Sequence, residues 1–200
     1  IRTRLVGSEM CIRDRDIRAK LAGCKFFSKL DFKTAFHQLE IAPESRHLTV
    51  FHDGKGRLMR YTRLTMGTSP ASGELNKALI PLFRDMPGVH VIHDDLILAT
   101  KSKEDHEELI DKVLKVILKS GMTLNAKKCF FLKLSIPFWG MIIGRDGVKP
   151  DPEKVDALRT VSPPTDKSEA MSFLCMIQSS TEFIPNLSQK TENLRAVSYT

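Results

Sequence analysis

Two adjacent carboxylates interrupt an otherwise apolar segment, and this feature restricts the possible fold more than any other. Val91–Leu98 reads VIHDDLIL, so β-prone residues flank Asp94 and Asp95 and indicate two short strands joined at the acidic pair. A plain hairpin turn explains the pattern, because Asp is common in turns. Tight hairpins nevertheless favour a Gly beside Asp or Asn, and none is present. Two like charges at one tip also repel unless a cation compensates, and Mg²⁺ is the usual choice for carboxylates.

A third carboxylate occurs where such a site would need one. Asp31 directly follows Cys24–Leu30 (CKFFSKL), an aromatic-rich strand candidate. An alternative role for Asp31 is to cap a short turn over residues 32–37. A single Asp at a strand end, about 60 residues before a strand–Asp-Asp–strand hairpin, is nevertheless the layout of a two-metal site. The three acids together therefore predict a Mg²⁺ site.

The remaining pattern alternates strand and helix signals. The clearest helix is Lys103–Ser120, where apolar residues recur every three or four positions and Gly121 follows. A second helix is predicted over Ser69–Phe83, with Ser69 as N-cap and Pro70 in the first turn. Further strands are expected at 39–41, 49–51 and 57–64 and, as two strands, within 130–143; further helices are expected at 152–160 and 166–177. Interleaved strands and helices predict α+β or α/β packing, with helices covering one face of a sheet.

Charge and composition narrow the functional class. The 200 residues carry a formal net charge of +7, which suits a polyanionic partner such as nucleic acid but also fits an ordinary basic protein. The longest apolar run, Ile136–Ile143, is too short to span a bilayer. No secretory signal opens the chain, so we expect an intracellular, soluble protein with no membrane partner. The four cysteines lack zinc-ligand spacing and are expected to be free thiols.

Six blocks in order resemble the reverse transcriptase of gypsy-type LTR retrotransposon polyproteins, over residues 20–195. The blocks are FFSKLDFKTAFHQLEI, LTMGTSPASGELNKAL, IHDDLIL, GMTLNAKKCFFL, PFWGMIIGRDGVKPDPEKVDALR and SFLCMIQSSTEFIPNLS. This resemblance implies a right-hand polymerase palm of α+β class, an antiparallel sheet with helices on one face, followed by a partial helical thumb. It also implies an RNA-directed DNA polymerase that acts on an RNA or DNA template with a primer strand and on dNTPs. The family copies its genome in cytoplasmic particles, which implies a cytoplasmic location.

The resemblance also assigns roles to the acidic residues. Asp31 and Asp94 would bind two Mg²⁺ ions, for which Mn²⁺ can substitute, with the Phe32 carbonyl as a further ligand and Asp95 completing the set. One ion would lower the pKa of the primer 3′-hydroxyl, and the other would stabilise the leaving pyrophosphate. Lys128 matches a lysine that protonates the pyrophosphate; a solvated surface lysine is the alternative.

Other matched positions concern the nucleotide and the primer. Phe36 matches an aromatic gate that excludes a 2′-hydroxyl, although a core aromatic is the alternative. Met66 and Gly67 match the block that packs against the incoming nucleotide, where the absence of a side chain permits close approach. Phe138, Trp139 and Gly140 match the primer grip; the alternative is a buried strand with a core tryptophan.

The resemblance further divides the chain. Residues 1–15 resemble a translated sequencing adapter and are predicted to be artefactual. Residues 16–145 would form the palm, with the fingers mostly missing, and 146–200 the start of the thumb. Ile92 stands where the family usually has Tyr or Phe, and QSSTEF replaces an aromatic-rich run in the thumb. The missing fingers and these departures leave open an inactive retroelement relic that only binds nucleic acid. Another palm-fold Mg²⁺ enzyme, such as a nucleotide cyclase, is a further alternative, against which the stretches PFWG and DPEKVDALR speak.

Overall fold

The computed structural model describes residues 20–138, 140–178 and 181–194. The chain forms two compact units, Ile1–Ile136 and Pro137–Thr200, which are described separately below. The stretch predicted to be artefactual, residues 1–15, lies outside the described residues.

An antiparallel sheet of four strands forms the centre of the first unit. The strand order is β4-β5-β1-β6, with bounds Val89–Ile92 (β4), Asp95–Thr100 (β5), Phe26–Asp31 (β1) and Phe130–Lys133 (β6). β1 pairs with β5 along its whole length, from Phe26 opposite Thr100 to Asp31 opposite Asp95. β6 joins the other edge of β1, where Lys29 lies opposite Phe130. The chain therefore brings residues about 100 positions apart onto neighbouring strands.

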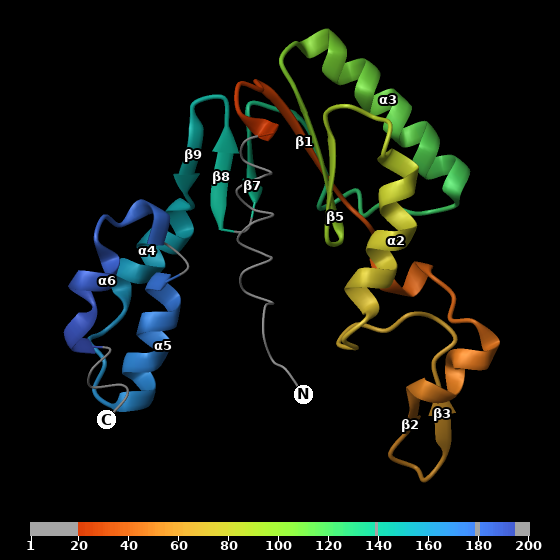
Figure 1. Ribbon diagram of the computed structural model, residues 1–200, viewed down its shortest axis with the longest axis horizontal. Coiled ribbons are helices and arrows are strands. Elements are labelled where there is room, and N and C mark those ends of the chain that lie inside the picture. The colour runs from red at the N-terminus through yellow and green to blue at the C-terminus, as the bar shows by residue number, and fades with distance from the viewer. Residues whose placement is uncertain (1–19, 139, 179–180, 195–200) are drawn as a thin grey trace. The chain divides into compact units, whose positions relative to one another are not determined.

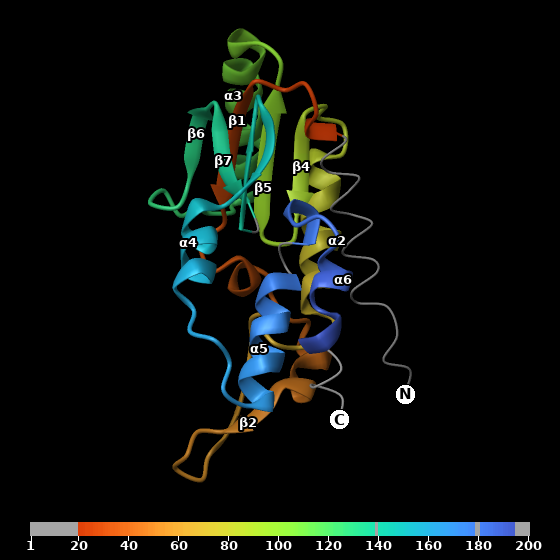
Figure 2. The same cartoon turned by 90° about the vertical axis from the view of Figure 1, so that its left-hand side faces the viewer.

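Two helices cover one face of this sheet (Figures 1 and 2). They are α2 (Ala71–Phe83) and α3 (Lys103–Ser120), each of which has a buried apolar stripe of helical period. The core between the layers joins residues of alternate strand positions to these stripes: Leu30, Leu96 and Leu98 from the strands, Leu75, Leu79 and Phe83 from α2, and Leu109, Val113 and Ile117 from α3. The predicted α+β class, with helices on one face of an antiparallel sheet, is confirmed.

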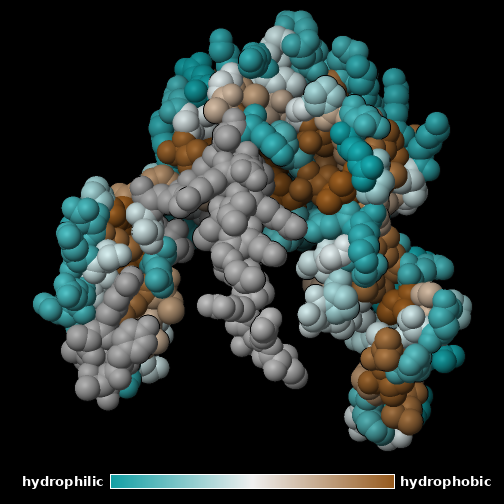
Figure 3. Space-filling view, in the orientation of Figure 1, coloured by the Kyte–Doolittle hydropathy of each residue, from teal (hydrophilic) through white to brown (hydrophobic). Residues whose placement is uncertain are grey.

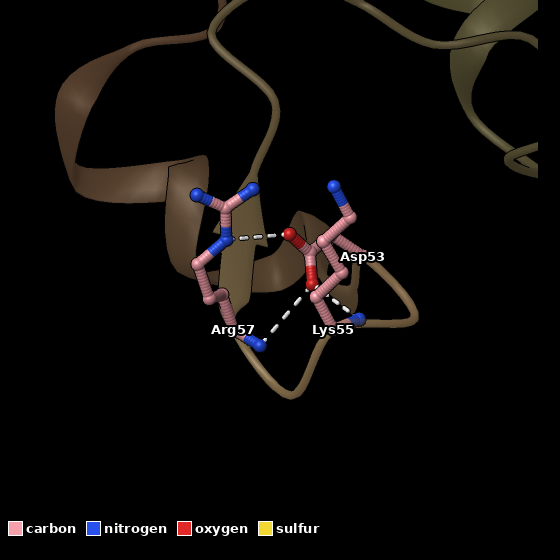
Figure 4. A network of polar contacts seen from close by, with 3 residues as sticks. All are labelled: Asp53, Lys55 and Arg57. Atoms are coloured by element: carbon pink, nitrogen blue, oxygen red, sulfur yellow. Dashed lines mark hydrogen bonds and ion pairs between the residues drawn. The ribbon is translucent and has the colours of Figure 1, made fainter.

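A small hairpin extends from the same unit. The 3-10 helices η1 (Ala35–Gln38) and η2 (Pro43–Thr49) lead into β2 (Val50–His52), which pairs with β3 (Leu58–Arg60). All six strand residues are exposed, and Figure 3 shows their apolar side chains as a brown patch. The Phe51 and Tyr61 rings stack at 4.9 Å. Asp53 closes the turn by accepting hydrogen bonds from the N–H groups of Lys55 and Arg57 and pairing with the Arg57 guanidinium (Figure 4).

The second unit contains a β-hairpin and a helical part. β8 (Met141–Gly144) pairs with β9 (Gly147–Pro150), and β7 (Ser135–Phe138), which crosses the boundary between the units, adjoins β8. The helices are α4 (Pro152–Thr160), α5 (Lys167–Gln178), η3 (Thr181–Phe183) and α6 (Leu187–Lys190). Leu174, Ile177 and Leu187 form their core. The boundary predicted between residues 145 and 146 falls in the β8–β9 turn, and the division into palm and thumb stays a prediction.

Several local predictions were wrong. Residues 39–41 do not form a strand, since Glu40 makes only an isolated bridge with Arg63. α2 begins at Ala71 and Pro70 takes the N-cap position, so Ser69 is not the cap. The sheet hairpin turns at His93 and Asp94, while Asp95 belongs to β5. Residues 130–143 hold parts of three strands where two were expected, and β9 was not anticipated.

Two further observations bear on the expected class of protein. Within the described ranges, no helix combines the length and apolar character needed to cross a bilayer. Cys24, Cys129 and Cys175 are free thiols, and Cys11 lies outside the described residues.

Candidate active site

The pairing of β1 with β5 brings two of the predicted acids together. Asp31 and Asp95 are direct cross-strand partners at the ends of their strands. Direct partners in an antiparallel pair share one face of the sheet, with Cβ atoms about 5 Å apart. The cap role considered for Asp31 does not apply, because η1 begins at Ala35 and Thr34 takes its N-cap position. The register alone therefore places the two carboxylates side by side.

The third acid, Asp94, lies in the tight turn between β4 and β5. Ile92 pairs with Asp95, which leaves only His93 and Asp94 in the loop. His93 adopts a φ of 55°, a left-handed conformation that costs a residue other than Gly about 1–2 kcal/mol. Two-residue hairpin loops require a positive φ in the loop, so the turn itself accounts for this conformation. Asp94 is exposed at this tip.

Asp95 has a cationic partner that the sequence analysis did not identify. The Lys29 ammonium lies 2.7 Å from Asp95 Oδ2, and both side chains are mostly buried. Burial raises the pKa of the Asp95 carboxyl, the contact with Lys29 opposes that shift, and the charges of Asp94 and Asp31 reinforce it. Desolvation therefore outweighs the ion pair in setting this pKa. Side chains along a strand point alternately to the two faces of the sheet. Lys29 lies two residues before Asp31, so the sequence alone could have placed both on the same face.

The loop after α3 is fastened to the backbone of Asp31. Asn125 donates its N–H to the Asp31 carbonyl at 2.8 Å, and the Asp31 N–H reaches Cys129 Sγ at 3.4 Å. Burial raises the pKa of the Cys129 thiol, and the nearby carboxylates act in the same direction, which keeps the group protonated. Lys128 lies between these two anchors with an exposed side chain. The structure thus brings the segment that carries Lys128 next to Asp31, although the role of Lys128 stays a prediction.

The predicted nucleotide-binding residues lie on two segments of the first unit. Phe32 is buried, and its backbone forms an isolated bridge with Leu124. Phe36 is half-buried and packs against the core, which agrees with the alternative that it is a core aromatic. Met66 is 59% exposed, and Gly67 has a φ of 84°. A Cβ built on Gly67 would meet no atom of the described chain within 4 Å, so the space beside it is open.

The predicted primer grip belongs to the second unit. Phe138 is buried at the end of β7, and Trp139 lies outside the described residues. Gly140 has a φ of 72°, a left-handed conformation that residues with a side chain rarely adopt, whereas the atoms that a Cβ would meet belong to the flexible end of Lys154. Glycine is therefore required here for local reasons, whatever the role of the turn.

The chemistry of the donors suits a hard divalent cation. Carboxylate oxygens are the ligands preferred by Mg²⁺ and Mn²⁺, and Asp31, Asp94 and Asp95 supply three such groups at one end of the sheet. Within the part of the chain that the structure describes, no three His, Cys, Asp or Glu side chains are already arranged around a metal position. The contact of Asp95 with Lys29 turns one of the three donors toward an ammonium instead.

Comparison with known proteins gives a consistent result. The model of the family "Reverse transcriptase (RNA-dependent DNA polymerase)" matches residues 4–143. The Pol polyprotein of the Drosophila melanogaster transposon gypsy is 35% identical over 160 residues, which is 79% of this chain and 15% of that protein. The corresponding polyprotein of the D. melanogaster transposon 297 is 31% identical over 188 residues, which is 90% of this chain and 18% of that protein. The chain thus spans less than a fifth of these relatives.

Solved structures show the same fold. A foamy viral protease-reverse transcriptase in complex with an RNA/DNA hybrid superposes with a TM-score of 0.86 at 25% identity, and the match covers 92% of this chain and 25% of that one. A foamy viral structure in complex with double-stranded DNA gives a TM-score of 0.84 at 25% identity, over 91% of this chain and 32% of that one.

Proposed function

Because this chain belongs to the reverse transcriptase (RNA-dependent DNA polymerase) family, we propose that it is the palm and initial thumb of an RNA-directed DNA polymerase. The observation that carries the proposal is the register that places Asp31 opposite Asp95, with Asp94 in the adjoining turn. We propose a template–primer duplex and dNTPs as its partners. The family match, the related Pol polyproteins and the fold of the foamy viral enzyme support this function.

The proposed reaction is nucleotidyl transfer. The primer 3′-hydroxyl loses its proton to solvent, and its oxygen attacks the α-phosphorus of a dNTP to form a new P–O ester bond. The bond between the α-phosphorus and the oxygen that bridges to the β-phosphate breaks, which releases pyrophosphate. Asp31 and Asp94 would hold two Mg²⁺ ions, with Asp95 beside them, and the ions when bound would activate the 3′-hydroxyl and neutralise the phosphate charge. Strand pairing would hold Asp31 and Asp95 in position, and the two-residue turn would hold Asp94 beside them, which would limit the reorganisation needed during the reaction.

Other residues of the chain contribute binding and proton transfer in this proposal. The exposed Lys128 ammonium, on the loop anchored to Asp31, would give a proton to the leaving pyrophosphate. The Phe36 ring would lie under the deoxyribose and clash with a ribonucleotide 2′-hydroxyl. The open space at Gly67 would admit the base pair at the growing end. Phe138, Trp139 and Gly140 would hold the primer terminus.

Primer extension tests the proposal. A labelled DNA primer on an RNA template is incubated with dNTPs and Mg²⁺, and the Asp94→Asn variant is compared with the unmodified chain. We expect extension to fall by at least about 100-fold, because the amide supplies a neutral oxygen where a charged ligand is needed. Asp85→Asn, which changes an exposed acid after α2, is the matched control and should extend normally.

Two results would contradict the proposal in different ways. Extension that survives Asp94→Asn would refute the site assignment. A chain without extension that still binds nucleic acid in a salt-sensitive manner, unaffected by Mg²⁺ and by Asp94→Asn, would favour a relic that only binds nucleic acid.

A further inference from the structure

Lys29 occupies an unusual position for a lysine. It lies in the middle of β1, on the same face as Asp31, and its side chain is only 20% exposed. Asp95, its partner at 2.7 Å, is 13% exposed. Because both charged groups are largely removed from water, their interaction is screened far less than that of a surface pair. The ammonium therefore acts strongly on the carboxylates around it.

The ion pair has a direct consequence for the acidic cluster. Asp31, Asp94 and Asp95 together carry three negative charges, and Asp95 Oδ2 is engaged by Lys29. A divalent cation that approached the cluster would find Asp95 Oδ2 already paired with the Lys29 ammonium. The same ammonium would also place a positive charge a few ångströms from the cation. At that separation, like charges repel appreciably even at the effective dielectric constant of a protein surface.

We propose that Lys29 is a positioning residue that orients Asp95 and competes with divalent cations for its carboxylate. The ammonium compensates the clustered negative charge when no cation is bound, and a cation must displace it to gain Asp95 as a ligand. Lys29 thus weakens cation binding at this site and makes Asp31 and Asp94 the first donors to be used. This inference rests on the proposed function, because it concerns the same cations.

Direct cation binding tests the inference without any need for turnover. Mn²⁺ is titrated into the full chain at fixed neutral pH, and free Mn²⁺ is measured by electron paramagnetic resonance. Displacement of bound Mn²⁺ by added Mg²⁺ then gives the affinity for Mg²⁺. Lys29→Met keeps the length and apolar stem of the side chain but removes its charge. We expect this variant to bind Mn²⁺ about tenfold more tightly than the unmodified chain. Lys29→Arg retains the charge and should bind within about twofold of the unmodified chain.

A control lysine separates the local contact from general charge. Lys25 lies one residue before β1, four positions from Lys29 and therefore roughly 13 Å along the strand direction. That distance exceeds the Debye length at physiological salt, so Lys25→Met should leave Mn²⁺ affinity unchanged. In an Asp95→Asn background the gain from Lys29→Met should become clearly smaller, because the contested carboxylate is gone and only the repulsion between the ammonium and the cation remains.

The outcomes distinguish this inference from the proposed function. Equal or weaker Mn²⁺ binding by a folded Lys29→Met variant would overturn the inference alone, as would a gain of the same size in the Asp95→Asn background. Circular dichroism and thermal melting of each variant establish that it is folded. A chain that binds no Mn²⁺ in any variant would instead overturn the cation site, and with it both proposals.

Discussion

At the scale of single residues, Gly88 illustrates how tightly the chain is packed where it enters the β4–β5 hairpin. It directly precedes β4, has a φ of 87°, and accepts a hydrogen bond from the Ala99 N–H. A Cβ at this position would lie 2.8 Å from the Ala99 carbonyl oxygen and 3.2 Å from Leu109 Cδ2. A side chain here would therefore push β4 away from β5, which together form the turn that carries Asp94.

We predict that Gly88→Ala destabilises the chain by about 2–5 kcal/mol, the sum of a left-handed backbone penalty and overpacking. Gly121→Ala is the matched control, because Gly121 has a φ of 75° but a Cβ there would meet no described atom within 4 Å. It should cost only about 1–2 kcal/mol. Urea denaturation measures the free energy of unfolding of both variants. Equal losses of stability would contradict the prediction, because they would mean that the new Cβ at residue 88 does not strain the contact with Ala99.

At the scale of elements, a buried polar network joins α3 to the sheet. Thr100 donates its hydroxyl to the Ser102 carbonyl and so accepts the Nδ1–H of His106 at 2.9 Å. The remaining nitrogen of His106, Nε2, then accepts the Ser28 hydroxyl at 2.7 Å, and Ser28 Oγ accepts the Leu132 N–H. Every group in this chain of hydrogen bonds is satisfied when His106 is neutral. Burial accordingly lowers the pKa of His106.

This network predicts a loss of stability in mild acid. A histidine whose pKa is lowered by folding contributes stability above its unfolded pKa and loses that contribution as pH falls below it. The free energy of unfolding should therefore decrease between pH about 7.5 and about 5.5, a range that spans the ordinary histidine pKa. His90, whose pKa is also lowered by burial, acts in the same direction. His106→Leu should remove part of the decrease; an unchanged pH dependence in this variant would contradict the role assigned to His106.

Elements with strong local signals were predictable from the sequence, whereas long-range pairing was not. α3 has the predicted bounds because its apolar period, the Ser102 cap and Gly121 are all local features. The proximity of Asp31 to Asp94 and Asp95 was predictable because strand ends and the order of blocks indicate it, while their catalytic role stays a prediction. Strand alternation indicates that Lys29 shares a face with Asp31, but its contact with Asp95 and the contact of Cys129 with Asp31 depend on the register between β1 and strands that lie far away in sequence.

At the scale of the whole molecule, the first unit holds the three acids and the loop that carries Lys128, while the second unit holds the predicted primer-grip residues Phe138 and Gly140. The net charge of +7 suits a polyanionic template–primer. The central claim is that two segments far apart in sequence, β1 and the β4–β5 hairpin, supply acids that act as one catalytic unit.

Single-nucleotide incorporation by Asp31→Asn, Asp94→Asn and the double variant tests that claim most directly. The rate is measured on an RNA template with a DNA primer and Mg²⁺, with Asp111→Asn on the exposed face of α3 as the control. Residues that act as a unit are strongly non-additive, so each single variant should lose about as much rate as the double variant. Losses that multiply in the double variant, or near-normal incorporation by either single variant, would contradict the account.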